Sequence, residues 1–517
     1  MGNLLSRNGQ RNPPLTISSD TVIPLHRLDD TPMTRAVIVE YTMRFDDVLD
    51  SDKLRLSLEK LLNRRDWRKL GARLRLNTDG KLEYHMPEFF DETRPAFVYS
   101  HVAHDSGIAQ HPTGRRLPRA TTKPTIFSDP EDFAPLLRRW DAPRYLDDYL
   151  YTDAPQLSLH VVSFTDATIV SLSWPHTFLD AMGRRALLDA WVAVLEGRDE
   201  DVKPLYGVFE DPLESLGTNP QEPYVLAKRR LSPIKAWFFA VFYIWATMFW
   251  HRGEETRMIY LPAAHVKALH KEALDYLATQ SDDDGEKPKE ENKVQPFLSE
   301  GDVLSAWISR LAMSHLRHAN HVISIINAFG LRSVLAKDLL PPTHAYVGNA
   351  VACVCAFLPM SDLFNKPLGY IASAVRRSIT EQGTRAQIEA RAAIDLAASK
   401  KGKISVFGDP TMIPIMISNW TKGKFFETDF SAAVVARPGD GTEEKRDSKE
   451  IGRPSYIQPN GLTNGVPIRN SFPIVGKDAK GNYWLSGTLR VGLWGRVQEL
   501  LDEEFNRFAL REPKVAA

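Results

Sequence analysis

The sequence has few cysteines and no apolar run long enough to cross a membrane. Only two of its 517 residues are cysteines, Cys353 and Cys355, too few for a disulfide framework or a thiolate zinc site. Period-2 alternation along an expected strand over 346–358 places both on one face, where we expect buried, inert thiols. The N-terminus has no long apolar stretch, which excludes a secretory signal and predicts a cytoplasmic protein.

An excess of one charge is also missing. Lysine plus arginine and aspartate plus glutamate number 65 each, so no net field would gather nucleic acid around the protein, and nucleic-acid binding is set aside. A Gly-x-Ser-x-Gly nucleophile elbow is absent, which disfavours a serine hydrolase. Apolar residues make up 43% and charged residues 25% of the chain. This composition is typical of a globular protein, and the length favours two domains.

Two features indicate a membrane surface. The first six residues, Met-Gly-Asn-Leu-Leu-Ser, fit the pattern for N-myristoylation of Gly2. The stretch 236–250 is rich in aromatic residues and follows four basic ones, Lys228, Arg229, Arg230 and Lys235. Its fifteen residues fall short of the roughly 20 that a spanning helix needs. The stretch therefore predicts either a peripheral membrane contact through an interfacial helix or a core helix packed between domains.

Alternating strand-rich and helix-rich segments predict two mixed α/β halves. We expect a flexible tail over 1–20, an N-terminal domain over 21–215, a crossover over 216–256 and a C-terminal domain over 257–517. Hydrophobic periodicity places the expected strands and helices of the two halves at 36–45, 50–65, 73–77, 156–164, 167–174, 182–195, 258–261, 302–317, 324–329, 346–358, 368–390, 412–420 and 483–493. Two charged inserts, 281–293 and 437–450, predict solvated loops.

Three His-x-x-x-Asp matches begin at His26, His101 and His176, so spacing alone cannot choose among them. Context favours His176, because an expected strand runs into it and an expected apolar helix follows. A histidine at the mouth of a buried cleft can act as a general base, although an ordinary core histidine is the alternative. Asp180, if buried, needs a cationic partner.

The segment from His176 to Asp180 resembles the His-x-x-x-Asp-Gly hallmark of the BAHD acyltransferases. Further segments resemble that family's landmarks in the family's order: Pro24-Leu-His-Arg-Leu-Asp29, Ser299-Glu-Gly-Asp302 to Trp307, Arg332 with Tyr346-Val-Gly-Asn-Ala350, Ser418-Asn-Trp420 and Thr428-Asp429-Phe430. Three departures stand out, namely Ala181 for the glycine, Trp307 directly after Ala306, and Ser431-Ala-Ala433 for Gly-Trp-Gly. Such looseness resembles the divergent fungal natural-product branch of the family.

The resemblance implies two chloramphenicol-acetyltransferase-like domains with an active-site tunnel between them. It also implies a monomer that uses acyl-CoA as co-substrate and holds no permanent cofactor and no metal. His176 would take the proton from a hydroxyl or amine of the acceptor, a small molecule of secondary metabolism. Ser418 and Trp420 would donate to the oxyanion, Asp180 with Arg332 would hold the histidine loop, and Asp429 would support the site.

Two other functions fit the same fold. Condensation domains of peptide synthetases carry a second histidine before the motif, whereas Pro175 stands there in this chain, and no carrier domain follows. A non-catalytic protein that binds a small molecule or a partner is the other alternative. Erosion at 431–433 favours this alternative, and the intact His176 and Asp180 oppose it.

Overall fold

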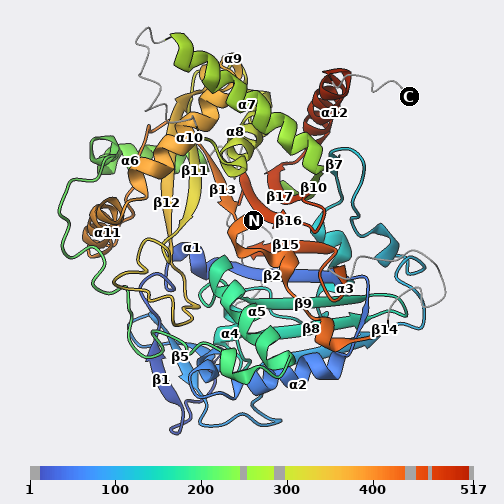
Figure 1. The fold of residues 1–517 in the computed structure, drawn as a ribbon. Helices are drawn as coiled ribbons and strands as arrows, with labels where there is room; N and C mark the ends of the chain where they lie inside the picture. The colour runs from blue at the N-terminus through green and yellow to red at the C-terminus, as the bar shows by residue number, and fades with distance from the viewer. Residues whose placement is uncertain (1–11, 245–252, 284–296, 437–449, 464–467, 512–517) are drawn as a thin grey trace.

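The protein has a mixed α/β fold built on two large sheets (Figure 1). The computed structural model describes residues 12–244, 253–283, 297–436, 450–463 and 468–511. Gly2, residues 245–250 of the aromatic stretch and most of the two charged inserts lie outside these ranges. The sequence prediction of a mixed α/β architecture is confirmed.

The first large sheet has the strand order β15-β2-β9-β8-β6. Its strands are β2 (Val37–Phe45), β6 (Val98–Ala103), β8 (Ser158–Ser163), β9 (Thr168–Pro175) and β15 (Tyr456–Thr463). Two amphipathic helices, α2 (Ser51–Leu62) and α5 (Ala181–Leu195), pack against each other and bury most of their leucines in the core beside this sheet. The two segments expected over 156–164 and 167–174 form a hairpin, because β8 and β9 pair antiparallel with Ser163 opposite Thr168.

The second large sheet has the strand order β12-β11-β13-β16-β17-β10-β7. Its strands are β7 (Thr125–Ile126), β10 (Glu254–Leu261), β11 (Val322–Gly330), β12 (Val351–Pro359), β13 (Ile413–Asn419), β16 (Ser471–Lys477) and β17 (Tyr483–Arg490). Helices α7 (Ala263–Asp283), α8 (Glu300–Ala312), α10 (Leu368–Gln382) and α12 (Trp494–Arg511) join its core. Apolar residues of these strands and helices form a second hydrophobic cluster.

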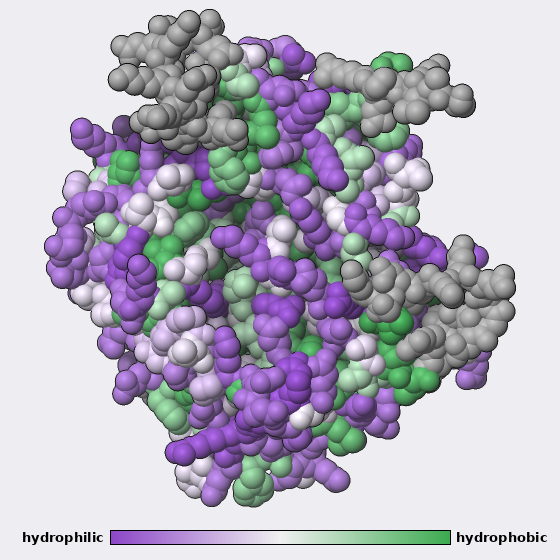
Figure 2. All heavy atoms as spheres, viewed as in Figure 1, coloured by the Kyte–Doolittle hydropathy of each residue, from purple (hydrophilic) through white to green (hydrophobic). Residues whose placement is uncertain are grey.

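Smaller elements complete the fold around these sheets. A three-stranded sheet has the order β1-β5-β4, and β14 pairs with β3. The remaining strands and helices are β1 (Thr21–Pro24), β3 (Val48–Leu49), β4 (Arg73–Leu76), β5 (Leu82–Met86), β14 (Val434–Ala436), α1 (Pro32–Arg35), α3 (Ala134–Leu137), α4 (Leu146–Leu150), α6 (Pro233–Ile244), α9 (Met360–Asn365) and α11 (Arg385–Ser399). The face seen in Figure 2 mixes hydrophilic and apolar side chains, with the hydrophilic ones more frequent.

Each large sheet contains one strand from the other half of the sequence. Strand β7, from the first half, forms the edge of the second sheet beside β10. Strand β15, from the second half, pairs antiparallel along nearly the whole length of β2 in the first sheet. The first core cluster accordingly includes Tyr260, Phe430 and Trp484 from the second half. The predicted domain boundaries at 215 and 256 stay predictions.

Two expected segments differ from the structure. The strand expected over 346–358 begins only at Val351, because residues 346–350 form an irregular loop whose backbone groups bond to other side chains. The segment expected over 368–390 is two helices, since Gly383 follows the end of α10 and Thr384 caps α11 by accepting a hydrogen bond from Gln387 N. Turn and capping residues interrupt a periodicity that continues across both helices.

The structure describes the first part of the aromatic stretch as a helix. The described part of the aromatic stretch lies in α6, whose apolar side chains are largely exposed. The alternative of a buried core helix is therefore wrong for this part. Among the described residues, no helix combines the length and apolarity needed to cross a bilayer.

Cys353 and Cys355 are free thiols in β12, and burial raises the pKa of Cys355 to about 12.

Candidate active site

His176 lies in a tight turn between β9 and α5, at the point where the sequence predicted it. Its backbone N–H donates to Val37 O at 2.9 Å, which continues the pairing of β9 with β2 by one residue. Its carbonyl oxygen accepts a hydrogen bond from Asn349 Nδ2 at 2.9 Å. Both backbone groups of the residue are thus fixed, one by each half of the chain, so the turn has little freedom to move.

The two ring nitrogens of His176 differ in accessibility: Nδ1 is inaccessible, and Nε2 is the accessible one. The residues that follow it, from Thr177 to Asp180, are buried, whereas His176 itself keeps part of its surface accessible. Its Nδ1 is inaccessible and has no well-aligned hydrogen-bond partner. The accessible part of the ring therefore lies away from Nδ1, which leaves Nε2 as the nitrogen that can meet a substrate. Burial lowers the pKa of His176, while contacts with its own backbone and Asp180 partly oppose the shift. The ring is thus neutral near pH 7 and able to accept a proton.

Asp180 is a fully paired buried carboxylate. Arg332 binds it in a bidentate manner, with Nη1 2.8 Å from Oδ2 and Nη2 2.9 Å from Oδ1. The N–H groups of Gly183 and Ala350 donate to it at 2.7 and 2.9 Å, the first because Asp180 is the N-cap of α5. Burial alone would raise the pKa of Asp180, but Arg332 and these N–H groups hold it below its ordinary value. The carboxylate joins the histidine turn to the loop 346–350 and takes no part in exposed chemistry.

Gly183 allows that loop to approach the helix. A Cβ atom placed on Gly183 would lie 1.9 Å from Val347 O, a distance that no side chain could occupy. The first turn of α5 therefore packs directly against the backbone of the loop.

Asp29, in the N-terminal segment 24–29, supports the histidine turn through Asn349. Asp29 accepts hydrogen bonds from Asn349 N at 2.6 Å and Asn349 Nδ2 at 2.8 Å. Because the same Nδ2 also donates to His176 O, Asp29 orients the amide that holds the turn. Burial raises the pKa of Asp29 to about 7, against the effect of the Asn349 donors. The His26 match thus belongs to the support of the site, whereas His101 is exposed on β6.

Ser418 and Trp420 lie at the end of β13 and act as a pair. Trp420 Nε1 donates to Ser418 Oγ at 2.8 Å, so the indole N–H is already used. The hydroxyl hydrogen of Ser418 remains available for a further acceptor. The prediction that both side chains donate to an oxyanion therefore needs a different geometry: in this structure Trp420 can act only through Ser418.

Arg184 is a residue of the site that motif reasoning missed. It is buried near the start of α5, with its guanidinium carbon 3.9 Å from the ring centre of Tyr41, 4.2 Å from Phe425 and 4.6 Å from Trp420. Its Nε and Nη2 have no hydrogen-bond partner, so the aromatic faces stabilise the charge. Burial lowers the pKa of Arg184 to about 10. The sequence carried no signal for this role, because the three aromatic rings come from residues far from Arg184 in the chain.

Asp429 supports its own loop. Its Oδ1 accepts a hydrogen bond from Ser431 N at 2.9 Å, and its Oδ2 lies 3.6 Å from Arg453 Nη2. The predicted support of the active site by Asp429 stays a prediction.

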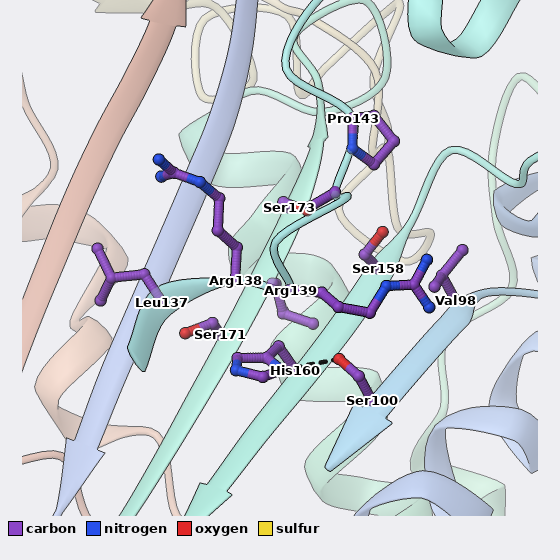
Figure 3. Close-up of a pocket in the computed structure, with 12 residues that line it drawn as sticks. Val98, Ser100, Leu137, Arg138, Arg139, Pro143, Ser158, His160, Ser171 and Ser173 are labelled. Carbon is purple, nitrogen blue, oxygen red and sulfur yellow. Dashed lines mark hydrogen bonds between the residues drawn. The ribbon is translucent and has the colours of Figure 1, made fainter. Parts of the chain in front are cut away.

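A polar cavity elsewhere does not belong to this site. The end of α3 and the loop after it, residues 137–143, cover one face of β6, β8 and β9, where Ser100 bonds to His160 Nδ1 at 2.7 Å (Figure 3). The cavity volume is about 20 Å³, which holds a water molecule rather than a substrate. None of the predicted site residues lines it. Among the described residues, no group of three or more histidine, cysteine or acidic side chains is arranged to hold a metal.

Known proteins resemble the chain along nearly its whole length. A family model described as "Transferase family" matches residues 143–449. The protein called transcriptional regulator calD of Penicillium decumbens is 43% identical over 94% of this chain and 96% of its own. The O-acetyltransferase PaAT-2 of Phomopsis amygdali is 40% identical over 94% of this chain and 98% of its own. The acetyltransferase adrJ of Penicillium rubens is 39% identical over 94% and 96%.

Two solved structures show the same fold. The crystal structure of F. graminearum TRI101 complexed with ethyl coenzyme A has a TM-score of 0.64 at 14% identity, covering 94% of this chain and 98% of that one. Vinorine synthase has a TM-score of 0.57 at 13% identity and covers 95% of both chains. The predicted fold with two chloramphenicol-acetyltransferase-like domains is confirmed. By its family model and its relatives, the chain belongs to the Transferase family, the BAHD acyltransferases.

Proposed function

We propose that the protein transfers an acyl group from acyl-CoA to a hydroxyl group of a small secondary-metabolite acceptor, with His176 as general base. The observation that carries the proposal is the placement of His176: its imidazole is accessible on the Nε2 side and lies in a turn fixed from both halves of the chain. Burial, which lowers the pKa of His176, supports its role as a base. Membership of the BAHD acyltransferases supports the choice of acyl-CoA as donor.

In the proposed reaction, His176 Nε2 removes the proton of the acceptor hydroxyl while its oxygen attacks the thioester carbonyl carbon. The tetrahedral intermediate then collapses, the carbon–sulfur bond breaks, and the protonated imidazole returns the proton to the CoA thiolate. No covalent acyl-enzyme forms. Holding both substrates side by side in a ternary complex, in a tunnel between the domains, makes the attack effectively unimolecular.

The developing oxyanion needs a donor, and we assign that role to Ser418. Its hydroxyl already accepts from Trp420, and a hydroxyl that accepts one hydrogen bond becomes a better donor in the next. Trp420 is then a positioning residue, and Arg184 holds the indole plane by its contact with the ring. Oxyanion donors of this kind contribute about 10²–10³ in kcat.

An acetyl group and an oxygen acceptor are the preferred specificity. Several relatives are named acetyltransferases, and PaAT-2 and the protein pboC of Aspergillus ustus are named O-acetyltransferase and O-acyltransferase. The names of these fungal relatives support oxygen rather than nitrogen as the acceptor atom. The monomeric state and the cytoplasmic location stay predictions.

A non-catalytic role is the second candidate, because calD and the protein sdnM of Sordaria araneosa are named transcriptional regulators. The balance of 65 basic and 65 acidic residues gives this chain no field to attract DNA. A non-catalytic protein would also have no need to keep His176 neutral and its turn bonded. Acyl-CoA turnover separates the two roles.

The test is the release of CoA thiol from a panel of acyl-CoAs with hydroxylated and amine acceptors and with water alone. The purified wild type is compared with His176→Ala and with His101→Ala, which removes the exposed histidine of another His-x-x-x-Asp match. We expect acceptor-dependent turnover, fastest with acetyl-CoA, that only His176→Ala abolishes. Equal turnover of His176→Ala and wild type would refute the base assignment. Failure of the wild type to bind any acyl-CoA would favour the non-catalytic role.

A further inference from the structure

Helix α6 presents an apolar stripe to solvent. Ile234, Trp237, Phe238, Val241 and Phe242 follow the i, i+3, i+4, i+7, i+8 spacing of one helix face. Their exposed fractions run from 70% at Ile234 to 39% at Phe242. The other face, with Ala236, Phe239 and Tyr243, is partly buried. Because the partly buried face is apolar as well, α6 is apolar on both sides, and the protein covers only one of them. Contiguous exposed apolar surfaces of this kind mark interaction sites.

The helix is held in this orientation by contacts at both ends. Before it, Leu231 N donates to Val406 O, and Gly408 N donates to Arg229 O, both at 2.9 Å. Towards its end, the ring of Phe242 lies 6.3 Å from that of His321. The exposed stripe is therefore a feature of a docked helix and not of a detached one.

A second segment extends the apolar surface. An isolated antiparallel bridge between Arg230 and Phe407 holds the end of the segment 400–407 beside the residues that lead into α6. Ile404 is 74% exposed. Both segments joined by this bridge thus carry exposed apolar side chains.

Basic side chains surround this surface. On the α6 side they are Lys228, Arg229, Arg230 and Lys235, and on the other segment Lys400, Lys401 and Lys403, all exposed. Acidic side chains near this region include Asp409, whose pKa is lowered by hydrogen bonds from Thr411 and, less strongly, by the charge of Lys235, and Glu254, whose charge acts on Tyr243 of α6. The surface thus combines a row of aromatic and aliphatic side chains with an excess of positive charge.

We propose that α6 and the segment 400–404 form a docking surface for an anionic lipid bilayer. Aromatic and aliphatic side chains would enter the interface while lysine and arginine contact the headgroups. A protein partner would need an apolar groove surrounded by acidic side chains. An anionic bilayer offers negative charge and apolar chains together at one planar surface. The inference concerns where the protein acts and stands apart from the proposed chemistry.

The test is co-flotation of the full chain with vesicles of phosphatidylcholine alone and with about a third phosphatidylserine, at low and high salt. One variant combines Trp237→Ser and Phe238→Ser, and another replaces Lys400, Lys401 and Lys403 with serine. Trp140→Ser is the matched control, because Trp140 is 93% exposed in another part of the chain. These side chains are exposed, so we expect all variants to fold.

We expect wild type and Trp140→Ser to float with anionic vesicles and to dissociate at high salt. Loss of each lysine should weaken binding about fivefold at low salt, and the Trp237/Phe238 variant should remain unbound. Absence of wild-type binding, or equal binding of the Trp237/Phe238 variant, would overturn the proposal. A dimer in light scattering that this variant abolishes, without vesicle binding, would also overturn it and assign the surface to a second copy of the chain.

Discussion

Breaking the ion pair between Asp180 and Arg332 should destabilise the protein more when the arginine is replaced than when the aspartate is replaced. In Arg332→Met, Asp180 loses a bidentate partner while its side chain is only 3% exposed. Two backbone N–H groups remain as its donors. In Asp180→Asn, Arg332 keeps 21% exposure and its bonds to the carbonyl oxygens of Tyr346 and Gly348. The arginine can therefore recover hydration that the aspartate cannot, so we expect the larger loss in Arg332→Met.

The magnitude follows from the burial of the pair. Removing one partner of a buried pair costs about 3–5 kcal/mol. We expect Arg332→Met to fall within this range and Asp180→Asn to lie below it, at about 2 kcal/mol, since its remaining charge is partly solvated. The double variant should cost less than the sum of the single ones, because no charge is then left unpaired.

The same variants should change the response to pH. The folded pKa of Asp180 is lowered, so its contribution to wild-type stability is present above the unfolded value of about 3.9 and is lost as pH falls through the folded pKa. Without Arg332, burial raises the folded pKa instead, so Arg332→Met should lose stability as pH rises above about 3.9. Urea unfolding of the four proteins at several pH values measures both effects. Additive costs below about 1 kcal/mol, with the same pH response in all four, would refute the reasoning.

Further predictions concern the His176 turn and its neighbours. His176→Ala should lower kcat about 10²–10⁴-fold with the fold intact, and the acid limb of the wild-type kcat/KM profile should lie below pH 6.5, since the base must be neutral and its pKa is lowered. Gly183→Ala should prevent the packing of α5 on Val347 and yield little folded protein, whereas Gly495→Ala, with open space around the new methyl group, should leave thermal unfolding almost unchanged. Arg184→Met should keep the fold but lower kcat more than KM rises, and should alter Trp420 fluorescence; unchanged kinetics would remove Arg184 from the site.

Local patterns predicted the strand, turn and helix around His176 correctly. The apolar β-branched run of β9, the periodic leucines of α5 and the intervening His176 are all close in sequence, so the strand, turn and helix could be identified without tertiary information. The resemblance then supplied the distant partner Arg332, and the structure confirms that it binds Asp180. Helix capping explains the position of Asp180, since a side-chain oxygen at the N-cap satisfies a free N–H of the first turn.

Contacts between distant segments could not be predicted in this way. The two-residue strand β7 carries no periodicity, and β15 contains Pro459 and Gly461, which are unusual in a strand. Both exist because neighbouring strand edges pair with them. Likewise, Arg184 looks like an ordinary helical residue until three aromatic rings from different segments surround it.

The departure from the family's glycine after the aspartate follows from where the backbones meet. In this chain the close approach to Val347 occurs at Gly183, and a Cβ is impossible there. Ala181, at the position of the family's glycine, is only partly buried in the same helix. A side chain is therefore tolerated at 181 and excluded at 183, so the substitution leaves the Asp180 cap intact.

The departure at 431–433 has a similar local cause. Phe430, which precedes it, remains a core residue, with its ring centre 5.4 Å from Phe45 and 4.8 Å from Trp191. A Cβ on Gly452 would lie 2.2 Å from Ser431 N, so the space next to this backbone depends on a glycine from another segment. Because the close approach is made by Gly452, residues 431–433 themselves need not be glycines. The absence of glycines at 431–433 therefore does not indicate a loss of catalysis. It no longer favours a non-catalytic role over the catalytic role that His176 supports.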